Sequence, residues 1–176
     1  MAKRLVPLVS EREILATVKR LAQNIDQDYG DRSPIVVGVL KGAFIFLADL
    51  IRQMQTPIRR VELLRLSSYG SETTSSGEVK VLMGLPEGIL AHQDVLLVED
   101  IVDTGLSTAT ALELLKAQQP ASLKLCSLLD KPDRRRVPIT IDYLGLTIPD
   151  RFIVGYGTDM DEQYRQLPAI YSVEDG

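Results

Sequence analysis

The first thirty residues carry the clearest helical pattern in the chain. Ser10 and Glu13 form a capping box, a pair that satisfies two of the free N–H groups at a helix start. Gly30 is the type of residue that commonly follows a helix end. The pattern therefore predicts one amphipathic helix between these residues. Its apolar face, at spacings of three and four, comprises Ile14, Leu15, Val18, Leu21, Ala22 and Ile25.

Short apolar runs rich in Val and Ile follow, separated by helical patterns over residues 41–54 and 106–119. Most of these runs lack polar alternation, which is typical of strands buried on both faces. Strands that alternate with helices predict a parallel sheet with helices on both faces, whose ligands bind beyond the carboxyl ends of the strands. The predicted strands are residues 34–40, 58–66, 79–84, 95–98, 122–129 and 152–157. In the helix over 106–119, the predicted core stripe is Leu106, Ala109, Leu112 and Leu115.

Length, charge and cysteine content restrict the class of protein. A chain of 176 residues predicts a single domain over residues 1–176. Its net charge of −4 argues against a nucleic-acid-binding protein. The start of the sequence has no apolar secretory segment, and no stretch approaches the ~20 apolar residues of a membrane span. The one cysteine, Cys126, fits a reducing compartment, so we expect a cytoplasmic protein.

The stretch VLLVEDIVDTG, residues 95–105, places three carboxylates directly after a buried strand. Glu99, Asp100 and Asp103 are then expected at the rim of the ligand crevice. Thr104 and Gly105 follow, where small residues and the free N–H groups of a helix start favour an anion. Carboxylates can bind sugar hydroxyls or a metal-bound ligand. The turn therefore fits a sugar phosphate with an associated divalent cation.

Two other interpretations apply to the same turn. In the first, the loop is merely acidic and solvated, and Asp103 or Thr104 caps the following helix. In the second, the run VLLVED resembles the acidic pocket of response-regulator receiver domains. The acidic pair of those domains lies near the chain start, whereas here it is central and too little chain follows to complete that fold. We therefore reject the second interpretation.

Five segments together resemble the hypoxanthine and hypoxanthine-guanine members of the purine phosphoribosyltransferase family. In the order expected for that family they are LKG at 40–42, SSYG at 67–70, EDIVDTG at 99–105, LLDK at 128–131 and PDRFIVGYGTDMDEQYR at 149–165. The resemblance covers about residues 10–174. It implies an α/β fold of the type I phosphoribosyltransferase kind, in which helices flank a parallel sheet and the N- and C-terminal segments form a small hood.

The resemblance also implies a reaction. A 5-phosphoribosyl group would pass from 5-phosphoribosyl 1-diphosphate to N9 of hypoxanthine or guanine, giving IMP or GMP and diphosphate. Because the carbon under attack becomes cation-like, such an enzyme must hold the leaving group, orient the base and manage the purine proton. The family further implies Mg²⁺ and a homodimer or homotetramer. The alternatives are a relative that prefers xanthine or guanine, and a related regulator that binds nucleotides and RNA.

By the same resemblance, the three carboxylates of the acidic turn have two different roles. Glu99 and Asp100 would bind the ribose hydroxyls and Mg²⁺, whereas Asp103 would face the purine N7 proton as general base. The loop for the 5′-phosphate would comprise Thr104, Gly105, Leu106, Ser107 and Thr108, with Ser107 standing where the family often has Thr.

The remaining segments would supply the diphosphate, the base and the second metal. Leu40, Lys41, Gly42 and Arg165 match diphosphate-binding residues, and Asp159 matches a magnesium ligand within the purine-binding set. Lys131 would contact the oxygen at purine position 6, Phe152 would stack on the base, and Ile153 would offer backbone contacts. Residue chemistry alone favours a core position for Phe152 and leaves solvated positions open for Lys41 and Lys131.

Two loops complete the prediction. Residues 67–78 are small and polar, which predicts a long connection, and the resemblance makes Ser68 and Tyr69 part of a lid over the active site. Residues 133–136, DRRR, predict a solvated or subunit-interface loop.

Overall fold

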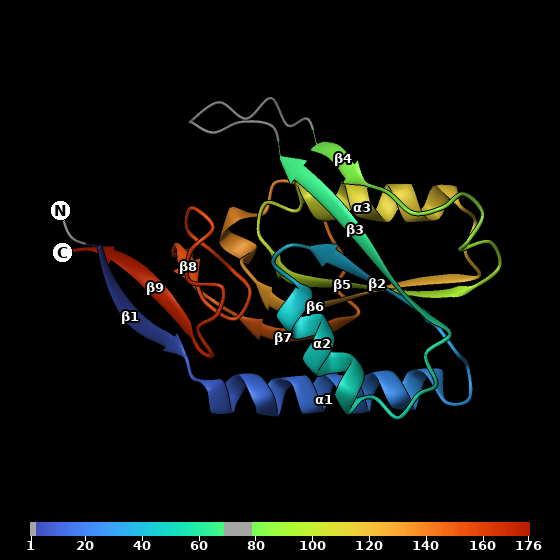
Figure 1. Cartoon of the computed structure of the whole chain (residues 1–176), viewed down its shortest axis with the longest axis horizontal. Helices are drawn as coiled ribbons and strands as arrows, with labels where there is room; N and C mark the ends of the chain where they lie inside the picture. The colour runs from blue at the N-terminus through green and yellow to red at the C-terminus, as the bar shows by residue number, and fades with distance from the viewer. Residues whose placement is uncertain (1–2, 69–78) are drawn as a thin grey trace.

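A six-stranded sheet forms the centre of the fold in the computed structural model, which describes residues 3–68 and 79–176. The strand order is β4-β3-β2-β5-β6-β7, and only β4 runs antiparallel to its neighbour. This arrangement confirms the predicted parallel sheet (Figure 1). The strands are β2 (Ile35–Leu40), β3 (Arg60–Ser68), β4 (Val79–Met83), β5 (Asp94–Val102), β6 (Ser122–Asp130) and β7 (Tyr143–Thr147).

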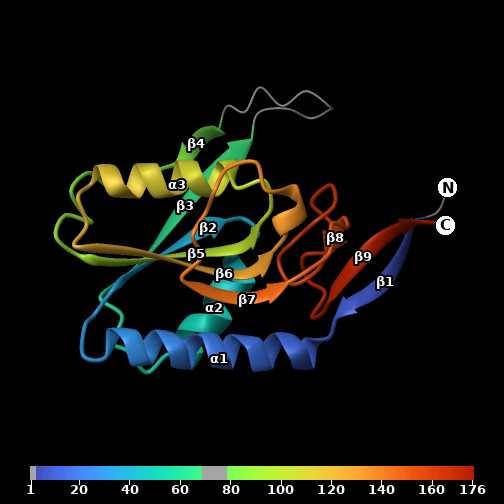
Figure 2. The same ribbon diagram turned by 180° about the vertical axis from the view of Figure 1, so that it is seen from behind.

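Helices cover both faces of this sheet, as predicted. Helices α1 (Glu11–Tyr29) and α2 (Phe44–Gln53) lie on one face, and α3 (Leu106–Ala117) lies on the other (Figures 1 and 2). The predicted capping box is confirmed: the Glu13 backbone N–H donates to Ser10 Oγ at 3.3 Å, and the Ser10 N–H donates to Glu13 Oε2 at 2.9 Å. Gly30 ends α1 with a positive φ of 55°.

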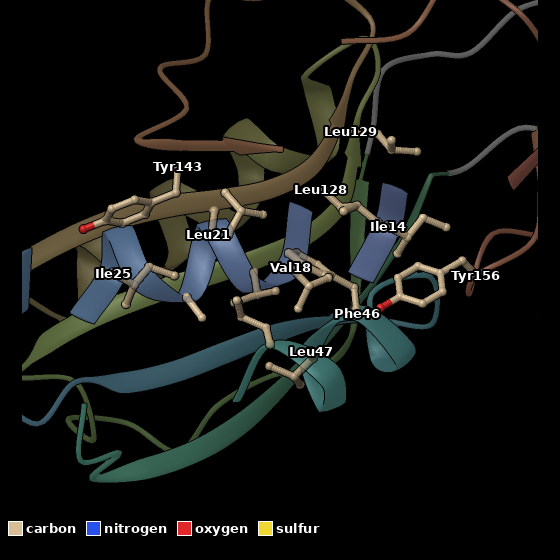
Figure 3. Packing of buried hydrophobic residues seen from close by; sticks show 14 of the residues in the cluster. Ile14, Val18, Leu21, Ile25, Phe46, Leu47, Leu128, Leu129, Tyr143 and Tyr156 are labelled. Atoms are coloured by element: carbon tan, nitrogen blue, oxygen red, sulfur yellow. The ribbon is translucent and has the colours of Figure 1, made fainter. Parts of the chain in front are cut away.

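Two apolar layers, one on each face, hold the sheet and helices together. Beneath α1, residues such as Ile14 and Leu21 pack with Phe46 of α2 and Leu128 of β6 (Figure 3). Each of these side chains is at most 1% exposed, and burial of one such side chain contributes about 1.5–3 kcal/mol. These layers fix where the strands end, and the strand ends carry the polar residues of interest.

A second sheet of three strands lies beyond the carboxyl ends of the first. Strand β1 (Lys3–Val9) pairs with β9 (Ile170–Asp175), which also pairs with β8 (Ile153–Val154). We call this sheet, with the chain from Phe152 to the C-terminus, the hood. The described ends of the chain lie side by side there (Figure 1). The hood implied by the family resemblance is therefore present.

The hydrophobic pattern missed three strands and overestimated a fourth. Strands β1, β7 and β9 were not predicted from it. The run over 152–157 forms a strand only at Ile153–Val154, because Gly155 and Gly157, with φ of 102° and 101°, turn the chain away. A short 3₁₀ helix, η1 (Pro132–Arg134), follows β6.

Two sequence predictions fall at the edge of the described chain. Tyr69 and the rest of the proposed lid to residue 78 lie outside the described residues, and Ser68 is the last residue of β3. Among the residues that are described, no helix combines the length and hydropathy that crossing a membrane requires.

Candidate active site

Two adjoining clefts open where the strands of the main sheet end. The first, which we call the loop cleft, has a volume of about 260 Å³ and lies at the turn between β5 and α3. The second, the hood cleft, has a volume of about 340 Å³ and lies between the sheet and the hood. Asp100, Ile101 and Asp103 line both. The loop cleft also includes Val39, Leu40, Leu66, Glu99, Thr104, Gly105, Ser107 and Thr108; the hood cleft also includes Lys41, Gly42, Lys131, Arg134, Phe152, Ile153, Thr158, Asp159 and Arg165.

Glu99 and Asp100 are carboxylates held in a poorly solvated position at the end of β5. Glu99 is only 4% exposed and accepts a hydrogen bond from the Thr108 hydroxyl at 3.4 Å. Burial, together with the neighbouring Asp100 charge, raises the pKa of Glu99 well above its usual value. Burial raises the pKa of Asp100 to about 6, against the opposing effect of two backbone hydrogen bonds and of Arg165. Donors or a cation brought by a ligand would stabilise both charged forms.

The turn after these carboxylates exposes backbone amides. Gly105 has a φ of 86°, a left-handed conformation that glycine adopts most readily, and α3 begins at the next residue. The N-cap residue Gly105 has no side chain to cap this helix, and no acidic residue lies in its first turn. The Leu106 N–H donates to Thr104 Oγ1 at 3.4 Å, whereas in the described part of the chain no hydrogen bond is found for the next N–H groups, which lie at the loop cleft beside the hydroxyls of Ser107 and Thr108. Such a site binds an anion such as phosphate.

Asp103 sits at the junction of the two clefts among basic side chains. Its Oδ1 lies 3.4 Å from Arg134 Nε, and Arg134 also lies 3.7 Å from Asp150. The same Oδ1 is buried and has no hydrogen-bond partner among the described residues. Lys131 is 4% exposed nearby, and burial lowers its pKa while the Asp103 carboxylate acts in the opposite direction. A ligand that offers Asp103 a proton and Lys131 an acceptor would satisfy both groups.

The prediction of a solvated loop over residues 133–136 is confirmed for Asp133, Arg134 and Arg136, which are exposed, and is wrong for Arg135. Arg134 lines the hood cleft, and Arg135 is held inside the fold rather than in solvent. The Arg135 guanidinium pairs with Asp130 and donates to the backbone oxygens of Val102 and Asp103, at 3.2 and 3.1 Å. A run of charges suggested a solvated loop, but its position directly after β6 brings it to the carboxyl end of β5.

The loop after β2 approaches the acidic pair closely. The Leu40–Lys41 peptide bond is cis. A Cβ on Gly42 would overlap the Asp100 carboxylate, so only glycine fits between this loop and β5. A Cβ on Gly157 would likewise overlap the Gly42 backbone oxygen. The loop is therefore packed between the main sheet and the hood, with Lys41 at its edge.

Arg165 faces this loop from the hood. Its guanidinium donates to the Gly157 backbone oxygen at 2.7 Å and pairs with Asp159 at 2.9 Å and with Glu162 at 3.2 Å. Its Nε is buried and lacks a hydrogen-bond partner among the described residues. Arg165 is thus fixed in direction and retains one donor for a ligand.

Phe152 and Ile153 form the apolar wall of the hood cleft. Phe152 is 54% exposed, so the core position that residue chemistry favours is wrong. Ile153 is buried in strand β8. An exposed ring beside Lys131 and Asp103 offers a flat surface on which a planar heterocycle can stack.

The structure brings together most of the residues that the sequence singled out. Among the predicted site residues whose side chains the structure describes, all line one cleft or the other apart from Leu106, which lines neither; the proposed lid residue Tyr69 lies outside the described residues. Sequence reasoning missed Ile101, Arg134 and Thr158 in the shared and hood clefts, and Val39 and Leu66 in the loop cleft. Arg134 could have been found from its place three residues after Lys131. The others are apolar or singly polar residues without a sequence signal.

The carboxylates of the two clefts are the candidate ligands for the expected Mg²⁺. Within the described ranges, no three His, Cys, Asp or Glu side chains converge closely enough to hold a metal alone. However, Glu99 and Asp100 are buried like charges, and the Asp159 carboxylate adds to the repulsion at Asp100. Mg²⁺ prefers such hard oxygens and usually completes its shell with substrate phosphates and water. The site therefore fits Mg²⁺ that binds together with a diphosphate ligand.

Comparison with known proteins identifies the family of the chain. The family model described as a phosphoribosyl transferase domain matches residues 8–161. The chain is 45% identical over 174 residues to a hypoxanthine-guanine phosphoribosyltransferase of Aquifex aeolicus, covering 98% of this chain and 97% of the relative. It is 42% identical over 168 residues to a hypoxanthine phosphoribosyltransferase of Salmonella typhimurium, covering 94% and 93%.

A solved structure gives the same result. The crystal structure of a hypoxanthine-guanine phosphoribosyltransferase from Bacillus anthracis superposes with a TM-score of 0.89 at 42% identity, covering 96% of this chain and 98% of the other. The superposition includes the sheet and the hood, because it covers nearly all of both chains. The chain belongs to the phosphoribosyltransferase family, among its hypoxanthine and hypoxanthine-guanine members.

Proposed function

We propose that this enzyme transfers the 5-phosphoribosyl group of 5-phosphoribosyl 1-diphosphate to N9 of hypoxanthine and guanine, releasing diphosphate and yielding IMP or GMP. The observation that carries the proposal is the convergence of Asp103, Lys131 and Phe152 on the hood cleft, beside the loop cleft with its helix start. One cleft suits a planar base with an oxygen acceptor, and the other suits a sugar phosphate. The relatives carry names of purine salvage enzymes of this kind.

The loop cleft binds the sugar phosphate in this proposal. The 5′-phosphate accepts hydrogen bonds from the amides and hydroxyls between Thr104 and Thr108, at the positive end of α3. Glu99 and Asp100 accept hydrogen bonds from the ribose hydroxyls. These donors replace the water that burial has removed from the two carboxylates.

The hood cleft selects and orients the base. Phe152 stacks on the purine, and backbone groups at Ile153 contact its edge. The Lys131 ammonium donates to the oxygen at position 6, which excludes adenine because its amino group would leave the buried lysine unpaired. Asp103 faces N7 and accepts its proton.

The chemical step then balances. The N9 lone pair forms a bond to C1 of the ribosyl group as the C1–O bond to diphosphate breaks, and the electron pair of that bond leaves with diphosphate. The proton on N7 passes to the Asp103 carboxylate. Lys41, the amides near Gly42, and Arg165 hold the diphosphate, and Arg165 Nε is a donor left free for it.

We infer that Glu99, Asp100 and Asp159 are the protein ligands of Mg²⁺ when the diphosphate substrate is present. The ion supplies positive charge next to the departing diphosphate. Asp100 and Asp159 line the same cleft as Lys41 and Arg165, the residues assigned to diphosphate, so they would hold the ion together with that ligand.

A single-domain chain, a cytoplasmic location, assembly into a homodimer or homotetramer, and closure of a lid by Ser68 and Tyr69 all stay predictions. Within the family, a preference for xanthine or guanine is the competing assignment for the base. The choice among these bases depends on contacts at purine position 2. Lys131 is assigned to position 6 and Asp103 to N7, so neither residue decides it.

The direct test offers the purified protein 5-phosphoribosyl 1-diphosphate and Mg²⁺ with hypoxanthine, guanine, xanthine or adenine in separate reactions. Nucleotide formation is followed by chromatography. We expect IMP and GMP, and no AMP above the level without enzyme. If only xanthine gave a nucleotide, the assignment of hypoxanthine and guanine as substrates would be wrong. If none of the four bases gave a nucleotide, the proposed transferase function would be rejected.

A further inference from the structure

Glu162 is the one residue of the hood that binds both side chains assigned to the diphosphate. Its Oε1 lies 2.8 Å from Lys41 Nζ, and its Oε2 lies 3.2 Å from Arg165 Nη2. One carboxylate thus bridges two cations that lie far apart in the sequence. Each of its oxygens contacts one of them. Two oxygens of a diphosphate would make the same pair of contacts.

The backbone holds Glu162 in this position. The Glu162 N–H donates to Asp159 Oδ2 at 2.8 Å, and Met160 and Gln163 form a pair of backbone hydrogen bonds at 3.2 and 3.0 Å. Asp161 and Glu162 have φ values of 52° and 66°, in the left-handed region that non-glycine residues seldom occupy. Unfavoured conformations of this kind tend to persist where function requires them. The turn is therefore built to present Glu162 rather than being a relaxed surface loop.

The contact is also weak enough to be replaced. The Glu162 side chain is 64% exposed and the Lys41 side chain is 41% exposed, and exposed ion pairs contribute little to stability because water and salt screen them. Arg165 keeps its direction without Glu162, since Nη1 donates to the Gly157 backbone oxygen and Nη2, which contacts Glu162, also pairs with Asp159. A more highly charged anion can therefore displace Glu162 and find Arg165 already in place.

We propose that Glu162 is an internal competitor for the diphosphate subsite, which sets how tightly the enzyme holds diphosphate. The inference rests on the proposed assignment of Lys41 and Arg165 to diphosphate. With the ligand absent, the Glu162 carboxylate occupies the place between the two cations, with one oxygen bound to each. Substrate entry displaces it, and its return favours release of product diphosphate.

Two isosteric variants separate this role from a general effect of charge. Glu162→Gln removes the charge that contacts Lys41 and Arg165. Asp161→Asn removes an equal charge from the adjacent, exposed residue, for which no contact to either cation is found in the described structure. Both new side chains are amides of the same shape as the original, and Asn tolerates positive φ well. The two proteins therefore have the same net charge and differ only in which residue lost it.

Titration calorimetry with inorganic diphosphate in Mg²⁺ buffer gives the affinity. We expect the Kd of Glu162→Gln to fall about three- to tenfold below that of the wild type, the size expected from loss of a screened competing ion pair, and Asp161→Asn to stay within twofold. The KM for 5-phosphoribosyl 1-diphosphate should fall by a similar factor without a rise in kcat.

An unchanged or weaker affinity in Glu162→Gln, with transferase activity intact, would overturn the competitor role alone. Equal tightening in both variants would also overturn it, because the effect would then come from net charge. If none of the three proteins binds diphosphate and none forms nucleotide, the diphosphate assignment and this inference fail together.

Discussion

The loop cleft draws most of its lining from one continuous stretch, residues 99–108, whereas the hood cleft gathers side chains from segments spread between Lys41 and Arg165. The first is a strand end and a helix start joined by Gly105, so its geometry follows from local structure. The second depends on how the hood packs on the sheet, through contacts such as those of Gly42 and Gly157. Local residues thus determine the loop cleft, proposed for the sugar phosphate, and long-range packing determines the hood cleft, proposed for the base and diphosphate.

This difference predicts which substitutions change one step of binding or chemistry and which change the stability of the fold. Changes in the hood cleft should alter base choice, proton transfer or diphosphate binding while the loop cleft keeps its phosphate. Changes in the acidic pair should alter stability in the absence of ligand.

Replacement of the residue shared by both clefts should have the largest effect. Asp103→Asn removes the group assigned to accept the N7 proton, and general-base catalysis typically contributes about 10²–10⁴-fold. We expect kcat with hypoxanthine to fall within that range in steady-state assays, while the affinity for IMP changes little. Turnover equal to that of the wild type would remove Asp103 from the chemical step.

Loss of the buried ammonium should relax base choice. Lys131→Met keeps an unbranched side chain but cannot donate to the oxygen at position 6. Since an unmet polar contact in a site of this type costs about 1–3 kcal/mol, we expect the ratio of kcat/KM for hypoxanthine to kcat/KM for adenine to fall about 10- to 100-fold. A ratio that stays constant would show that another group distinguishes the bases.

The acidic pair predicts a pH-dependent stability with a defined sign. Asp100 has a pKa of about 6 in the fold, above the ~3.9 of an unfolded Asp, so the folded state binds the proton more strongly. Its contribution to stability is therefore lost as pH rises from about 4 through about 6. Asp100→Asn should raise the stability of the ligand-free protein by about 1–2 kcal/mol at pH 7.5, and much less at pH 5. Thermal melts at both pH values measure the difference, and a variant less stable than the wild type at pH 7.5 would contradict it.

The smallest effect is expected from Arg134, which lines the hood cleft but is partly exposed, as predicted. Arg134→Ala removes a half-exposed charge 3.4 Å from Asp103, and such pairs are worth at most about 1 kcal/mol. We expect kcat/KM to fall about two- to fivefold. Arg136→Ala is the matched control, because Arg136 is exposed and only its backbone contacts the β5–α3 turn. Equal losses in both variants would mean that Arg134 has no specific effect on Asp103.

The same contrast explains how far the sequence could predict the molecule. The parallel sheet and the capping box at Ser10 follow from local patterns, and the structure confirms them. The carboxylates lie at the carboxyl end of β5 as predicted, but the strand continues to Val102, so Glu99 and Asp100 belong to its last residues and the turn begins at Asp103. Strands β1, β7 and β9 were missed because edge and hood strands lack a fully apolar run. In α3 the predicted core stripe is confirmed at Leu115, which is buried, and Leu112 packs against the core, but the other buried positions are Thr108 and Ala111 rather than Leu106 and Ala109. The polar Thr108 is buried because Glu99 supplies it with a partner, which no hydrophobic pattern can show.

The hood cleft could be anticipated only through the family resemblance. Nothing local to Phe152 predicts that its ring is exposed, since its exposure depends on Gly155 and Gly157 turning the chain back toward Gly42. Arg134 and Arg135 read as a charged surface run for the same reason. Their partners, Asp103 and Asp130, lie at the ends of two neighbouring strands and become adjacent only when the sheet forms.

The most direct test of phosphoribosyl transfer to a purine is the release of diphosphate from 5-phosphoribosyl 1-diphosphate, measured in Mg²⁺ buffer with and without hypoxanthine. The proposal places the base in the hood cleft, next to the residues assigned to diphosphate, so diphosphate should leave only when that cleft holds a base. We predict one diphosphate released for each IMP formed and almost none without hypoxanthine. Release that is independent of the base, or no release with hypoxanthine present, would contradict the assigned reaction.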